Sequence, residues 1–224
     1  MNLSQYVPAK KAENLYLDEE EIDIALSRLA NPCDQALILS LYEGIQGAAW
    51  HEIRTLQLIN INKDTNEVKL YNKDGNDRTI KISDKLIKLL EETNLKQTYL
   101  LKNNENSQGE YEVTEFLDTI YIFRPLFNIY QKEGDFDYDI NEPISPYTLN
   151  NRFRNIKKYV ELPFISPTII YDSGMINKVL KLYGNKKIKN LEPMTIQQAL
   201  PEYKLSYTQA YNLKNKIELK LKYD

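Results

Sequence analysis

Apolar side chains in the first hundred residues recur at the spacing of helices. Ile22, Ala25 and Leu26 fall on one helical face, and Asp18 with Glu21 three positions later predicts an N-terminal capping box for that helix. Denser apolar runs predict three further helices, at about residues 34–44, 48–57 and 84–92. The first half of the chain is therefore predicted to be mainly helical.

A short stretch inside this half changes to a two-residue period. Residues 67–71 and 77–82 alternate polar and apolar positions, and the sequence Asp74-Gly75-Asn76 between them is typical of a tight turn. We predict a small antiparallel β-hairpin here. The predicted fold class is α/β, mostly α.

The middle of the chain combines polar loops with one aromatic run. Phe116, Ile120, Phe123 and Phe127 recur three or four positions apart and predict a long helix over residues 113–130, with its aromatic side chains in the core. Residues 103–111 and 134–143 are polar and predict surface loops.

The segment that follows Ser145 has a strong helix start. Serine is a preferred N-cap, and Pro146 suits the first helical position. Leu149, Phe153 and Ile156, with Val160, form the predicted buried stripe of this helix.

The other faces of this helix carry amide and basic side chains. Asparagine and arginine suit contacts with the edges of adenine and guanine, whereas lysine suits phosphates. We interpret the helix as a candidate for reading DNA bases; an ordinary amphipathic helix with a solvated basic face is the alternative. The candidate residues are Asn150, Asn151, Arg152, Arg154, Lys157 and Lys158.

The C-terminal stretch 194–221 also has a weak helix-turn-helix pattern. This pattern is permissive. Its last turns alternate leucine or isoleucine with lysine, which makes the C-terminal helix a candidate surface for a homodimer.

One segment resembles a motif of the tyrosine recombinases, or phage integrases. Ser166–Ser173 reads Ser-Pro-Thr-Ile-Ile-Tyr-Asp-Ser, where family members have roughly Thr-Pro-His-x-Leu-Arg-His-Thr. The resemblance places Thr168 at a catalytic histidine, Tyr171 at a catalytic arginine and Asp172 at the next histidine.

Three more segments resemble the same family in the same order. Glu52–Asn62 is similar to the run after the first catalytic arginine, whose place falls on Gln46 or, with a shorter gap, on Ala49. The predicted hairpin places Lys73 at the catalytic lysine. Toward the C-terminus, Glu202 stands for the last motif histidine and Tyr211 for the nucleophilic tyrosine.

The resemblance implies a tyrosine recombinase catalytic fold whose reaction has been lost. Phosphoryl transfer depends on positively charged groups around the phosphate, and a neutral tyrosine is a poor nucleophile without them. Replacement of the arginines and histidines therefore implies a protein that binds DNA without cutting it. The chain is most similar to the lysogeny repressors of SPbeta-like temperate phages, which have this fold.

The charge distribution supports a polyanionic partner despite the net charge of −3. Residues 146–224 hold 14 Lys and Arg against 6 Asp and Glu, whereas residues 1–145 hold 15 against 26. We expect double-stranded DNA to lie along a basic surface. Beyond the helix after Ser145, its predicted contacts are Lys73, Arg78, Lys186, Lys187 and Lys214.

Several protein classes are not supported. The single cysteine, Cys33, and the single histidine, His51, cannot form a disulfide framework, a histidine triad or a histidine-rich metal site, so no metal and no cofactor are expected. No apolar run has membrane-spanning length and no signal peptide is evident, so we expect a cytoplasmic protein of a bacterial host.

The expected domain plan is an arm or linker over residues 1–16 and a single integrase-like domain over 17–224, without the core-binding domain that precedes it in recombinases. An antirepressor protein or peptide is a further possible partner. Two alternatives remain: an active recombinase in which Arg54 and Arg78 replace the missing arginines, and a protein-interaction module that no longer binds DNA.

Overall fold

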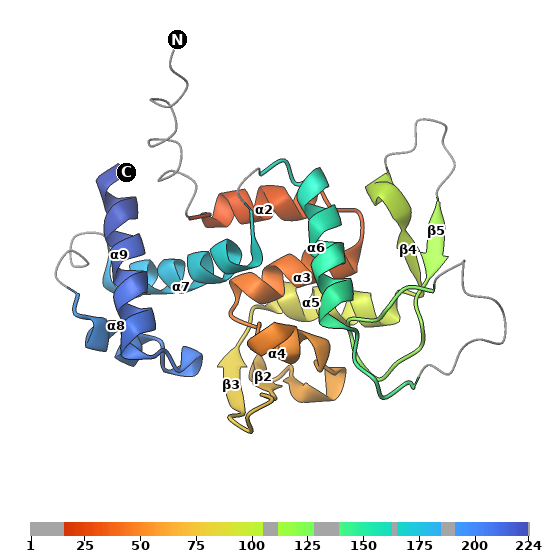
Figure 1. The fold of residues 1–224 in the computed structure, drawn as a ribbon, viewed down its shortest axis with the longest axis horizontal. Helices are drawn as coiled ribbons and strands as arrows, with labels where there is room; N and C mark the ends of the chain where they lie inside the picture. The colour runs from red at the N-terminus through yellow and green to blue at the C-terminus, as the bar shows by residue number, and fades with distance from the viewer. Residues whose placement is uncertain (1–15, 105–111, 128–138, 163–164, 185–190, 224) are drawn as a thin grey trace, which may run out of the picture.

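A computed structural model describes residues 16–104, 112–127, 139–162, 165–184 and 191–223, with side chains up to residue 219. The chain is mostly helical (Figure 1). Its helices are α2 (Glu19–Ser27), α3 (Pro32–Tyr42), α4 (His51–Arg54), α5 (Asp84–Leu95), α6 (Pro146–Tyr159), α7 (Pro167–Tyr183), α8 (Pro193–Ala199) and α9 (Tyr207–Tyr223).

Helix α3 is the centre of the fold. Its residues are buried on every side from Ala36 to Tyr42, and a helix that is apolar all round must be enclosed by other elements. Helices α5 and α7 pack on it, and α2 and α6 lie beside it (Figure 1). No helix among the described residues has the length and apolar character needed to cross a membrane.

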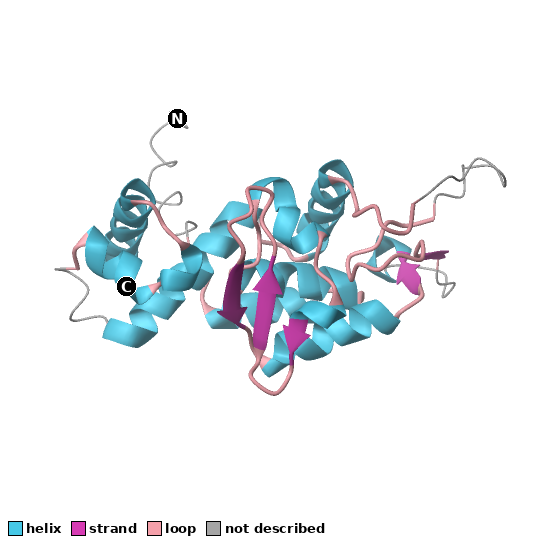
Figure 2. Cartoon of the chain, turned by 90° about the horizontal axis from the view of Figure 1, so that it is seen from below, coloured by secondary structure: helices cyan, strands magenta, loops and turns pink. Residues whose placement is uncertain are grey.

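Two small antiparallel sheets complete the fold (Figure 2). In the first, β2 (Glu67–Leu70) pairs with β1 (Ile61–Asn62) on one side and with β3 (Arg78–Lys81) on the other. In the second, β4 (Thr98–Leu100) pairs with β5 (Val113–Glu115).

Most predicted elements are confirmed. The capping box of α2 is present, with Asp18 and Glu21 bonding each other's backbone N–H groups. Ser145 caps α6 through the N–H of Thr148. The hairpin of β2 and β3 and the helix α5 stand where the sequence predicts them, within a few residues.

Two predicted helices are wrong. The helix predicted over 48–57 is broken into a 3-10 turn (Ala48–Trp50) and the single turn of α4, because Ala49 and Trp50 have left-handed backbone conformations. The described part of 113–130 forms β5 and irregular chain. Proline inside a helix removes a hydrogen bond and clashes with the preceding turn, so Pro125 was a signal against that helix.

The apolar side chains form two main cores. The larger lies around α3 and α5; the smaller joins the second half of α7 with α8 and α9. Helix α7 crosses both, and Gly174 lies at its contact with α3. A Cβ added to Gly174 would lie 1.7 Å from the backbone oxygen of Tyr42, so only glycine permits this approach.

We expect Gly174→Ala to destabilise the protein, although alanine ordinarily favours a helix interior by about 1 kcal/mol over glycine. The clash is with backbone, so the loss should reach the upper end of the roughly 1–3 kcal/mol that overpacking costs. Urea unfolding followed by circular dichroism measures it. The control on the same helix is Leu182→Ala at an exposed position, expected to change stability by less than about 0.5 kcal/mol. Stabilisation by Gly174→Ala would contradict this packing.

Candidate functional site

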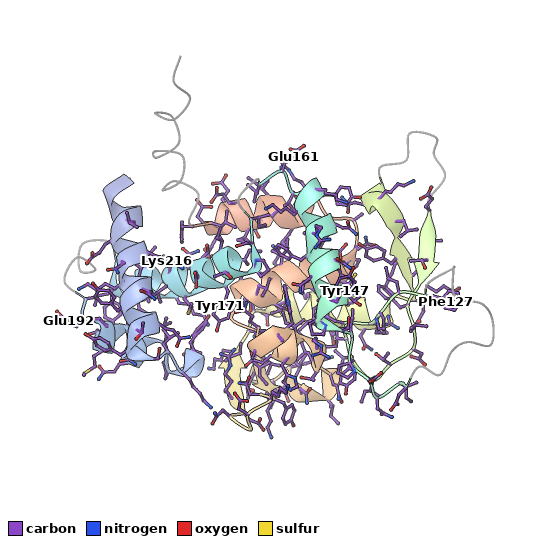
Figure 3. The ribbon with its side chains drawn as sticks, viewed as in Figure 1. Phe127, Tyr147, Glu161, Tyr171, Glu192 and Lys216 are labelled. Atoms are coloured by element: carbon purple, nitrogen blue, oxygen red, sulfur yellow. The ribbon has the colours of Figure 1, made fainter. Side chains whose placement is uncertain are left out.

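Two adjoining cavities lie where the smaller core meets the rest of the protein. Their volumes are about 290 and 540 Å³. Gln46, Tyr171, Tyr203 and Gln209 line both of them. Figure 3 labels Tyr171 on α7 and Lys216 on α9, the two helices that border the smaller cavity.

Three motif positions that carry neutral side chains line these cavities, together with Asp172. Gln46 lies between α3 and α4, and Thr168 and Tyr171 lie in the first turns of α7, whose N-cap is Ser166. The resemblance to tyrosine recombinases assigned catalytic side chains to these places. Neutral side chains occupy all three.

Tyr171 is held as a neutral phenol. Burial raises its pKa to about 12, although the nearby charge of Arg78 opposes that shift. Its ring meets the ring of Tyr203 edge-on, with 5.7 Å between centroids. Tyr171 therefore supplies a hydrogen-bonding group to the cavity and no positive charge.

The two substituted carboxylates have different surroundings. Asp172 lines the smaller cavity and forms an ion pair with Lys216 of α9. The Glu202 carboxylate lies 3.3 Å from the ammonium of Lys178 and lines neither cavity. Of the two carboxylates, only that of Asp172 therefore faces these cavities.

Arg78 is a structural residue in this conformation. Its side chain is nearly buried, and its Nε and Nη2 lie 2.7 and 2.6 Å from the two carboxylate oxygens of Glu52. The same guanidinium donates to the carbonyls of Gly44 and Glu202 at 2.5 and 2.8 Å. Burial would lower the pKa of Arg78, but the carboxylate of Glu52 raises it above its ordinary value. Arg78 lies at the wall of the larger cavity with its donors directed at protein acceptors, so the predicted DNA contact is not available to it here.

Both charges of this pair are buried. We therefore expect Glu52→Gln, which leaves the Arg78 charge without its counterion, to lower the free energy of unfolding by about 3–5 kcal/mol. Denaturant unfolding measures the loss. The exposed pair of Lys85 with Asp23 gives the control, because Asp23→Asn should cost less than about 1 kcal/mol. Equal effects of the two substitutions would contradict a central role for the buried pair.

The predicted lysine and nucleophile do not line the cavities. Lys73 is exposed in the turn between β2 and β3 and lines neither cavity. Tyr211 on α9 is 49% exposed and also lines neither, whereas Gln209 and Asn212 of the same helix do.

Arg152 does not belong to the exposed face of α6. It is only 5% exposed, and its Nη2 donates to the carbonyl of Arg124 at 2.9 Å. The guanidinium lies over the rings of Tyr99 and Phe116, 5.6 and 5.7 Å from their centroids. Position 152 therefore falls on the buried stripe of the helix, and in this conformation the Arg152 side chain does not reach the outer face on which base contacts were predicted.

Arg152 lies next to a buried network of polar side chains on the inner side of α6. Tyr99 and Asn31 donate to the carboxylate of Asp34 at 2.9 and 3.2 Å. Burial raises the pKa of Asp34, and the charge of Arg152 opposes that shift. Arg152 thus joins α6 to α3 and to the second sheet.

The remaining predicted residues of α6 lie on its outside. Asn150, Arg154, Lys157 and Lys158 are exposed, and Asn151 is partly exposed. Within the described part of the chain, Arg154 and Lys157 have no ion-pair or hydrogen-bond partner; elsewhere on the surface Lys85 and Lys181 are paired, and Lys88 is not. The outer face of α6 thus carries uncompensated positive charge.

The strained loop before α4 was missed by the sequence analysis. Gly44 and Gly47 have φ of +99° and +67°, and the non-glycine residues Ala49 and Trp50 follow at +50° and +64°. Left-handed conformations cost roughly 1–2 kcal/mol for each non-glycine residue. The loop places the indole nitrogen of Trp50 3.0 Å from Oδ1 of Asn150. The two glycines were the sequence signal for a turn rather than a helix start.

The other predicted contacts are scattered. Lys214 on α9 is partly exposed and lies 3.8 Å from Glu218 of the same helix. Lys186 and Lys187 lie outside the described residues. Among those described, no cluster of three or more His, Cys, Asp or Glu side chains could hold a metal ion.

The fold and the cavity define a class of protein. The chain superposes on a crystal structure of XerA recombinase with a TM-score of 0.57, which covers 93% of this chain and 64% of that one at 12% identity. It has the fold of a tyrosine recombinase catalytic domain. Residues 16–220 match the family model described as MrpR, C-terminal catalytic domain, and the chain belongs to this family.

A curated relative comes from an SPbeta prophage, the kind of phage whose lysogeny repressors the sequence resembles. The chain is 21% identical over 179 residues to the SPbeta prophage-derived uncharacterized protein YopR of Bacillus subtilis (strain 168). The match covers 79% of this chain and 52% of the relative, so the chain spans about half of that protein's length.

Proposed function

We propose that this chain is a non-catalytic, sequence-specific binder of double-stranded DNA that acts as a phage transcriptional repressor and maintains lysogeny in the cytoplasm of a bacterial host. The observation that carries the proposal is the outer face of α6. Exposed amide and basic side chains project there from a helix whose other side is fixed by Arg152 and Phe153. A rigid helix with such side chains suits the major groove, where Asn and Arg distinguish base edges.

The cavity supports the non-catalytic part of the proposal. Charge stabilisation of the transferring phosphoryl group is the main catalytic requirement, and Gln46, Thr168 and Tyr171 carry no charge for it. The two arginines that would have to replace the missing pair are engaged elsewhere. Arg78 pairs with Glu52, and Arg54 donates to the carbonyl of Ile144.

The prophage origin named for the curated relative supports a phage regulator over a host enzyme. Basic side chains on α6 without protein partners support DNA over a protein ligand, because unpaired surface cations favour a polyanion. The proposal also includes two protein partners: a second copy of the chain, bound through α9, and an antirepressor protein or peptide.

Selection of bound duplexes from a randomised DNA pool tests this function. We expect enrichment of a defined motif. Arg154→Ala should relax one position of that motif, at a cost of about 1–3 kcal/mol if the side chain reads a base. Lys157→Ala should weaken all sequences alike and lower the salt slope by about one. Lys88→Ala on α5, outside the proposed face, is the matched control and should change neither. An unbiased pool would contradict sequence-specific binding.

An active recombinase is the second candidate, because the matching family model is described as a catalytic domain. Incubation with nicked duplexes carrying the selected motif, followed by denaturing electrophoresis, distinguishes the two. We expect no covalent protein–DNA adduct, and Tyr211→Phe should bind DNA as the unaltered chain does. An adduct that Tyr211→Phe abolishes would establish the enzyme instead.

A further inference from the structure

The strained loop between α3 and α4 places a tryptophan, Trp50, against α6, where its indole N–H donates a hydrogen bond. Trp50 is a bulky residue with φ of +64°, directly after Ala49 at +50°. Bulky non-glycine residues with positive φ are rare, and such strain persists where the surrounding structure enforces it, most often at functional sites. The strain therefore directs attention to what the Trp50 side chain contacts.

Trp50 contacts α6 in two ways. Its ring packs against Phe153, with 6.2 Å between centroids, on the buried side of the helix. Its indole N–H donates to Oδ1 of Asn150 at 3.0 Å. The tryptophan is 7% exposed and Asn150 is exposed, so a buried group holds a side chain that reaches the surface.

The direction of this hydrogen bond is fixed by chemistry. An indole nitrogen only donates, so it can bind the oxygen of the Asn150 carboxamide and not its NH2 group. A free asparagine can rotate and exchange the two ends of its amide. The contact with Trp50 removes that freedom, because the exchanged orientation would place two donors against each other.

A fixed amide has a defined recognition property. The NH2 group of Asn150 keeps its donors, and the oxygen keeps a second lone pair beyond the one that Trp50 uses. A donor beside an acceptor is the pattern that pairs with N7 and the N6 amino group of adenine in the major groove. Guanine offers acceptors at both places, so it matches only half of this pattern.

We propose that Trp50 is a positioning residue which fixes the Asn150 carboxamide so that α6 reads one adenine in the DNA site. The proposal rests on the function proposed above and adds a specificity device to it. Trp50 touches no DNA in this arrangement; it acts through Asn150 alone. The strained backbone of the loop is then what places the Trp50 side chain where it can orient the Asn150 carboxamide.

Trp50→Phe is the direct test, because phenylalanine keeps a ring against Phe153 and removes the N–H. In the randomised selection, we expect the variant to return the same motif with one adenine position relaxed about tenfold, within the range that a bidentate base contact supplies. Asn150→Ala should relax the same position, and the double variant should relax it no further, as expected for two residues that act as a unit. Asn155→Ala on the same helix is the control for general disturbance of α6.

A purely structural role would give a different result. Trp50→Phe would then weaken binding to all duplexes alike and leave the base preferences unchanged, which would overturn the inference and leave the proposed function standing. Failure of the unaltered chain to select any motif would overturn both.

A measurement without DNA covers the case in which Trp50→Phe does not fold. The chain has a single tryptophan, so its indole N–H gives one nuclear magnetic resonance signal that needs no assignment. Asn150→Ala should shift this signal and speed its exchange with solvent, and Asn155→Ala should not. An indole signal unaffected by Asn150→Ala would mean that the hydrogen bond is absent and would overturn the inference.

Discussion

The buried ion pair of Arg78 with Glu52 is the contact on which the arrangement of this protein depends. It joins the start of β3 to α4, and the same guanidinium reaches the carbonyl of Gly44 after α3 and that of Glu202 before α9. Elements from both cores therefore meet at one cation. Buried charges are tolerated only when they are paired and their hydrogen bonds are satisfied, so each of these backbone segments is held close to its place.

The same contact also helps to shape the larger of the two cavities at which the recombinase motif positions meet. Its walls include Arg78 and the edge-on rings of Tyr171 and Tyr203, and two carboxylates at the cavities are paired. Asp172 is paired with Lys216, and Arg78 with Glu52. Lys204, which also lines the larger cavity, donates to the backbone carbonyls of Asn76 and Asp77 and forms no ion pair with the described residues.

Helix α6 depends on a second buried cation. Arg152 lies over the rings of Tyr99 and Phe116, and its charge interacts with the carboxylate of Asp34, so the buried side of α6 is anchored by charge as well as by apolar packing. On the outer side, Arg154 and Lys157 carry charge without a partner among the described residues. The two arginines lie two positions apart on one helix, yet one serves the core and the other the surface. Helix geometry explains this, because positions two apart point in widely different directions.

Local signals in the sequence determined most of the secondary structure. Asp18 with Glu21, Ser145 before Pro146, and the alternating residues around Gly75 each act within a few positions, so their capping and turn chemistry can be predicted without knowledge of the rest of the chain. The aromatic run after Val113 has the spacing of a helix, but Pro125 within it is incompatible with a continuous helix.

The order of the four motifs was enough to predict the family fold. The neutral residues at Gln46, Thr168 and Tyr171 could also be identified from the sequence, because substitution is a property of the sequence alone. Only the tertiary structure decided which charged side chains are free. Arg78 and Arg152 interact with carboxylates, carbonyls and rings from segments distant in the chain. Trp50 likewise donates a hydrogen bond to Asn150, a hundred positions later in the sequence. Such partners are brought together by packing, and burial then sets whether a charge faces solvent or a counterion.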